Sequence, residues 1–156
     1  MIRMSRLADY GVVLMTQLAA RPEVLTTAPE LSLSSGLPVP TVSKILKALA
    51  QDGLLESQRG NKGGYALVRR AEEVSVAEII GALEGPIALT ECVGAEEGAC
   101  DFEALCPTRT NWQKINDVVI GALESISLAE MRAPNMAFVA APAAPAGREE
   151  GTSGWL

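Results

Sequence analysis

Three cysteines offer the most distinctive chemistry in this sequence. Cys92, Cys100 and Cys106 are the only cysteines of the 156-residue chain, and they are spaced C-x7-C-x5-C in an acidic segment that Gly94 and Gly98 interrupt. No helix or strand period explains this spacing, whereas a flexible loop can fold three thiols around one ion. The pattern therefore predicts a metal or iron-sulfur site; the alternative is three unrelated buried thiols.

The rest of the composition narrows the kind of cofactor. An odd number of cysteines argues against a disulfide framework. Zinc sites are usually completed by a fourth cysteine or a histidine, and the sequence contains no histidine. Three thiolates with one weaker ligand suit an iron-sulfur cluster better, either 2Fe-2S or 4Fe-4S. An enzyme with a nucleophilic cysteine would lack a histidine base, so we expect no enzymatic activity.

Length and hydropathy indicate one small cytoplasmic protein. A chain of 156 residues that is 48% hydrophobic can bury one core. The apolar run near the N-terminus is interrupted by Arg6, Asp9 and Gln17, so it matches neither a signal peptide nor a membrane span. We therefore expect a cytoplasmic protein with no membrane partner.

Charge is divided unevenly along the chain. Residues 1–70 contain nine Lys or Arg and five Asp or Glu, a net charge of +4, whereas residues 71–132 contain three and twelve, a net charge of −9. The remaining residues carry −1, which gives the total of −6. A basic first half can bind nucleic acid even though the whole chain is acidic.

The elements that must position these side chains follow from hydrophobic periodicity and capping residues. Three helices are predicted at about residues 6–20, 28–35 and 41–52. Two short strands follow at residues 54–57 and 65–68, and glycines suit the tight turn between them. This order predicts a mainly α protein with a winged helix-turn-helix, in which the two-stranded hairpin is the wing.

The second half of the chain is predicted to hold the cysteine loop between two further helices, over about residues 76–83 and 110–131. The long last helix carries an apolar stripe with roughly heptad spacing, which we expect to form a dimer seam rather than to cover the domain's own core. The stripe consists of Trp112, Ile115, Val119, Ala122, Leu123 and Ile126. The predicted parts are a head (1–70), a linking helix and cysteine loop (71–109), a dimerisation helix (110–132) and a disordered tail (133–156).

The exposed face of the third helix would contact DNA, because the helix after the turn of a winged helix enters the major groove. Its hydroxyls and lysines suit phosphate and base-edge contacts, and the basic wing suits a minor groove. The candidate DNA-binding residues are Thr41, Ser43, Lys44, Lys47, Arg59, Asn61 and Lys62. The alternative is a protein-binding winged helix on which these are solvated side chains.

Four segments are specific enough to compare with known families: LADYG at 7–11, LPVPTVSK at 37–44, RGNKGGY at 59–65 and the cysteine loop. Together they resemble the Rrf-two (Rrf2) family, the IscR-like and NsrR-like iron-sulfur transcription regulators, over residues 1–132. The segments EGPIALTEC at 84–92 and CPTRTNW at 106–112 are most similar to the branch that regulates the SUF iron-sulfur assembly operon.

The resemblance implies a homodimer of winged-helix subunits with a cluster in the cysteine loop. Some members carry a histidine ligand three residues after the last cysteine, where this chain has Arg109. NsrR-like members use an aspartate from the first helix of the other subunit, and Asp9 lies at the matching position. A carboxylate is a weak partner for cluster iron, so such a site would be labile. A thiol, water or Asn111 are the alternatives for this fourth ligand.

The resemblance also implies a function: a regulator that binds double-stranded operator DNA, senses iron-sulfur status and represses SUF assembly genes. It acts as a switch only if the two cluster states fit the operator differently. Two alternatives remain open, a nitric oxide-sensing repressor of the same family and an iron-sulfur carrier or scaffold that does not bind DNA. Salt-dependent DNA binding would exclude the carrier.

Overall fold

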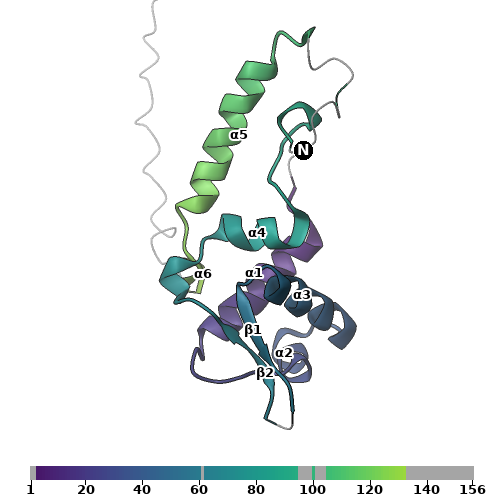
Figure 1. The fold of residues 1–156 in the computed structure, drawn as a ribbon, viewed down its shortest axis with the longest axis vertical. Coiled ribbons are helices and arrows are strands. Elements are labelled where there is room, and N and C mark those ends of the chain that lie inside the picture. The colour runs from purple at the N-terminus through teal and green to yellow at the C-terminus, as the bar shows by residue number, and fades with distance from the viewer. Residues whose placement is uncertain (1–2, 61, 95–99, 101–104, 133–156) are drawn as a thin grey trace, which may run out of the picture.

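The protein has a helical head with a small hairpin, and one long helix that stands away from the head (Figure 1). The computed structural model describes residues 3–60, 62–94, 100 and 105–132. Its elements are α1 (Arg6–Ala19), α2 (Ala28–Ser35), α3 (Val39–Gln51), β1 (Leu55–Gln58), β2 (Gly64–Leu67), the short 3-10 helix η1 (Ala71–Glu73), α4 (Val76–Glu84), the 3-10 helix η2 (Glu91–Val93), α5 (Arg109–Glu124) and α6 (Leu128–Arg132). Asn61 and the tail at 133–156 lie outside the described residues.

Local sequence signals place the first helices where they were predicted. Ser5 caps α1 by accepting hydrogen bonds from two backbone N–H groups at 3.1 and 3.2 Å. Thr27 and Glu30 form a reciprocal capping box at the start of α2. Gly36 ends α2 with a φ of +75°, a left-handed conformation that favours glycine. These bonds satisfy backbone groups that a helix end would otherwise leave unpaired.

One aliphatic core joins the head. The buried face of α3 consists of Val42, Ile45, Leu46 and Leu49. Residues distant in sequence complete this core: Leu14, Met15, Leu18, Leu31, Leu54, Leu55, Val74, Ile79 and Leu128. A second, smaller cluster of Ala8, Val76 and Ile80 lies between α1 and α4, and Leu123 of α5 packs against it. Burying one such aliphatic side chain contributes about 1.5–3 kcal/mol, so this packing fixes how the helices cross.

The hairpin is joined to the segment that leads into α2. Strands β1 and β2 pair in antiparallel register, with Gln58 opposite Gly64, and each lies one residue from its predicted position. Tyr65 and Thr26 exchange two backbone hydrogen bonds, at 2.9 and 3.1 Å. The wing is therefore fixed to the helix-turn-helix by backbone pairing as well as by its side chains.

The structure corrects one prediction: the long helix expected over residues 110–131 is two helices, α5 and α6. The residues between them pair with the chain before α4 instead of continuing the helix. Val76 N–H donates to Ile126 O at 3.0 Å, and Leu128 N–H donates to Val74 O at 2.8 Å. A serine and a glutamate then form a capping box at the start of α6. The apolar spacing continues from α5 into α6, which is why one helix was predicted. Long-range pairing and a local cap nevertheless end the first helix and start a second.

Helix α5 is mostly exposed. Asn116 is its one buried residue, and four of the six residues in the predicted apolar stripe are exposed: Trp112, Ile115, Ala122 and Ile126. Most of the predicted apolar stripe therefore does not cover the core of its own subunit. In the part of the chain that the structure describes, we find no helix with the length and apolar character needed to cross a membrane.

We expect Gly64→Ala to destabilise the attachment of the wing. An added Cβ would lie 2.9 Å from the backbone nitrogen of Thr26 and 3.0 Å from the carbonyl carbon of Leu25, and a backbone cannot rotate away as a side chain can. The free energy of unfolding in a denaturant titration should fall by about 1–3 kcal/mol. Gly81→Ala on α4 is the control, because no described residue outside its own turns of helix comes within 4 Å of its Cβ position. Equal losses in both variants would contradict the packing argument.

Candidate nucleic-acid interface and cysteine loop

The side chains predicted to bind DNA lie on α3 and on the hairpin. The four cationic side chains are exposed: Lys44, Lys47, Arg59 and Lys62. Thr41 and Ser43 are half-buried near the start of α3. The helical period explains this exposure, because positions 44 and 47 lie on the face opposite the aliphatic core.

Helix α3 and the wing line one shared hollow. Lys47 of α3 and Arg59 of the hairpin line the same cavity, of about 420 Å³, together with Thr27, Ser57 and Tyr65. None of the described residues that line it is acidic. Two cations from different elements thus face one space, an arrangement suited to following a phosphate backbone.

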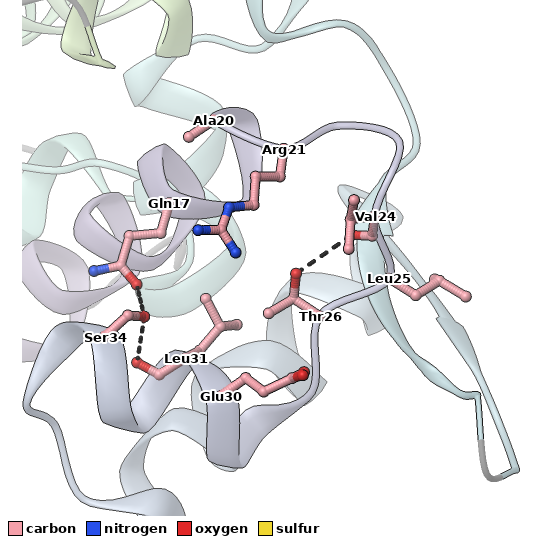
Figure 2. A pocket seen from close by; sticks show the side chains of 9 residues that line it. All are labelled: Gln17, Ala20, Arg21, Val24, Leu25, Thr26, Glu30, Leu31 and Ser34. Carbon is pink, nitrogen blue, oxygen red and sulfur yellow. Dashed lines mark hydrogen bonds between the residues drawn. The ribbon is translucent and has the colours of Figure 1, made fainter.

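A second hollow lies at the end of α1, against α2 (Figure 2). Its volume is about 320 Å³, and none of the predicted site residues lines it. Ser34 donates to the amide oxygen of Gln17 at 2.7 Å, and Thr26 donates to the Val24 carbonyl at 3.3 Å. Its hydroxyl groups therefore already have partners within the protein.

The 3-10 helix η2, which contains Cys92, and the start of α5, which follows Cys106, lie at the other end of the molecule from the hairpin (Figure 1). Cys92 is buried, whereas Cys100 and Cys106 are half-buried. Segments 95–99 and 101–104 lie outside the described residues. Within the described ranges, no three Cys, Asp or Glu side chains are gathered as a metal site. Convergence of the three thiols on one cluster therefore stays a prediction.

The surroundings of Cys106 favour the charged form of its thiol. Hydrogen bonds from the hydroxyl and the backbone N–H of Thr108 lower the pKa of Cys106, and Arg109 acts in the same direction through its N–H and its charge. The thiolate is the form that ligates metal. A set of three thiols, one of them in such surroundings, fits an iron-sulfur cluster by its donor chemistry.

Two side chains of α5 hold the chain that leads to the first cysteine. The Asn116 carboxamide accepts a hydrogen bond from Leu89 N–H at 3.0 Å and donates one to Ile87 O at 3.2 Å. Arg109 donates from Nε to the Cys92 carbonyl at 3.3 Å. Sequence reasoning did not find Asn116, because a single asparagine in a polar helix carries no spacing signal.

The two residues proposed or weighed as a fourth ligand are both exposed. Asp9 lies in the first turn of α1, and Asn111 lies in the first turn of α5. Asp9 is not gathered with two or more cysteines as a metal site among the described residues of one subunit. The assignment of Asp9 as a ligand thus depends on a second subunit.

Comparisons with known proteins find relatives over most of the chain. Residues 4–134 match the model of the Rrf2 family, described as an iron-dependent transcriptional regulator. The HTH-type transcriptional regulator IscR of Photorhabdus laumondii is 31% identical over 131 residues, which are 83% of this chain and 79% of that protein. IscR of Escherichia coli is 28% identical over 131 residues, which are 83% of this chain and 80% of that protein.

Comparison with solved structures also finds transcriptional regulators. CymR, the global cysteine regulator of B. subtilis, has a TM-score of 0.67 at 29% identity and covers 85% of this chain and 97% of its own. IscR of T. potens has a TM-score of 0.64 at 28% identity and covers 83% of this chain and 85% of its own. These matches confirm the predicted mainly α winged-helix fold. They also confirm that the chain is a regulator and not an enzyme.

We expect Lys44→Ala and Arg59→Ala each to weaken binding to a duplex from the gene's own promoter. Each lost phosphate contact should reduce the slope of log affinity against log salt by up to about one. Fluorescence anisotropy over a series of salt concentrations measures both quantities. Lys114→Ala, an exposed lysine of α5, is the charge-matched control. Unchanged affinity and slope in the Lys44→Ala/Arg59→Ala double variant would place the DNA surface elsewhere.

Proposed function

This chain belongs to the Rrf2 family of transcriptional regulators, and on that premise we propose that it is a homodimeric repressor whose operator affinity reports the state of an iron-sulfur cluster. The observation that carries the proposal is a continuous packed path between the two candidate sites. Helix α1 of the head packs on α4, α4 packs on α5, and α5 packs on η2, which contains Cys92. Changes around the cysteines thus have a physical route to the head.

In this proposal Cys92, Cys100 and Cys106 hold the cluster as thiolates. When bound, the cluster supplies iron that responds to oxidants and nitric oxide and that is lost when iron is scarce. Asp9 of the partner subunit would complete the ligand set, and its exposure in α1 leaves the carboxylate accessible to another chain. Arg109 replaces the histidine of other members and cannot ligate iron; its charge instead favours the neighbouring thiolate.

The target genes are proposed from resemblance. Segments 84–92 and 106–112 are most similar to the branch that regulates SUF assembly genes, and a repressor of such genes acts in the cytoplasm. Asp9 at the NsrR-like position and Arg109 in place of histidine favour a nitric oxide sensor as the second candidate. Operator release by nitric oxide, with no response to iron depletion, would select that candidate.

The homodimer would form through α5. An isolated amphipathic helix gains most of its stability by burying its apolar face against a partner, and the described part of its own subunit leaves Trp112, Ile115 and Val118 exposed. A second copy of the same helix presents the same apolar face, which a symmetric contact would bury. Dimerisation would also place two recognition helices on one operator.

Changing Cys92, Cys100 or Cys106 to Ala should each remove the visible chromophore and most of the iron from protein isolated without oxygen. Three thiolates leave no spare ligand, so each loss should be severe. Absorption spectra and iron analysis measure the result. Leu105→Ala is the control, because this side chain is 88% exposed and has no ligating atom. A cysteine variant with a wild-type spectrum and iron content would exclude that residue from the ligand set.

Ile115→Glu in the exposed apolar stripe of α5 should yield monomers, because a carboxylate would be buried in the apolar seam. Size-exclusion chromatography with light scattering measures the mass. Operator affinity should fall about tenfold or more, because two linked heads bind more tightly than one. Gln113→Glu adds the same charge to α5 outside the apolar stripe and should leave the dimer intact. An Ile115→Glu protein that remains dimeric would move the seam to another surface.

A further inference from the structure

We propose that Asn116 is the positioning residue that couples the cysteine loop to α5 and the head, so that operator affinity follows cluster state only while its hydrogen bonds are intact. This inference rests on the proposed function and assigns the coupling to one side chain.

Asn116 is the one buried polar residue in the described part of the chain, and its exposure is only 2%. A buried amide is costly unless it is hydrogen-bonded, and this carboxamide bonds at both ends, to Leu89 N–H and Ile87 O. The carboxamide thus offers the loop one acceptor and one donor, as the backbone of a neighbouring β-strand would. An apolar residue of similar size would fill the same space but leave both backbone groups unpaired.

The loop depends on this side chain for its position. Among the described residues, Asn116 is the only hydrogen-bonding partner of the backbone at 86–89. The Ile87 side chain packs against the small cluster that contains Ala8 of α1 and Val76 of α4. A bond to the Ile87 carbonyl therefore fixes the point at which the cysteine loop meets the first helix of the head.

Arg109 and Asn116 hold the same loop at two places. Arg109 binds the Cys92 carbonyl beside the cysteines, so it lies where cluster gain or loss acts directly. Asn116 lies seven residues further along α5, about 10 Å along the axis, and holds the end of the loop nearer the head. The helix between them is a rigid element, so a movement imposed at Cys92 reaches Ile87 through α5 as well as through the loop.

The consequence is a separation of functions. Replacing Asn116 removes no thiol and no cation of the DNA surface, so both cluster assembly and DNA contact remain available. What is lost is the difference between the cluster-bound and cluster-free states in their fit to the operator, which is the coupling itself.

The test uses the full-length protein with Asn116→Leu, and Gln113→Leu on the same helix as the control. Hydrogen exchange in the cluster-free form should show the Leu89 amide unprotected in Asn116→Leu and protected in the control. Iron content and operator affinity are then measured with and without the cluster. The factor by which operator affinity differs between the cluster-bound and cluster-free forms should shrink about fivefold or more in Asn116→Leu. In the control this factor should remain at the wild-type value. If Asn116→Leu does not fold, Asn116→Ser provides the same test, because its hydroxyl is too short to span both partners.

A folded Asn116 variant with an unprotected Leu89 amide and a wild-type affinity ratio would overturn the inference. The proposed function is tested first, on the wild type alone. If wild-type protein binds no cluster, or binds the operator equally well in both states, the proposed function fails before any variant is made.

Discussion

The close contact between α1 and α4 holds the two halves of this protein together. Gly11 lies close to it: a Cβ at this position would lie 2.2 Å from the Cδ1 atom of Leu83 on α4, so that side chain would have to move. Ala8, one turn earlier on α1, is fully buried against Val76 of α4. Small residues on α1 therefore allow the helix that precedes the cysteines to lie directly on the first helix of the head. The candidate ligand Asp9, the start of the cysteine loop and the packing of α5 all take their places from this contact.

The charge pattern complements this architecture. The first half of the chain carries +4 and the next part −9, and the structure places the hairpin at the other end of the molecule from η2 and the start of α5 (Figure 1). The cations of α3 and the wing would attract phosphate, and the acidic residues of the 71–132 part would repel it. The overall charge of −6 therefore represents neither the basic first part of the chain nor the acidic second part.

Local signals allowed much of the fold to be predicted from sequence, and long-range contacts account for what was missed. Helices α1 and α2 were predictable because Ser5, Thr27 and Gly36 act on neighbouring backbone groups. Helix α3 has no side-chain cap and begins at Val39, two residues before its predicted start at 41. The break between α5 and α6 was not, because it depends on pairing with residues about fifty positions earlier. The cysteines were found from their spacing, but Asn116 was not, because its partners are known only once the loop lies against α5.

The burial of Leu128 has a consequence for how the protein is made. This residue is fully buried in the core of the DNA-binding head, although it lies in α6, after the cysteines. During synthesis the ribosome must therefore release the whole cysteine segment before the head can complete its core. A nascent chain that ends before α6 lacks a core residue of its own DNA-binding half. The order of translation thus makes the cysteine segment available before the head is fully folded.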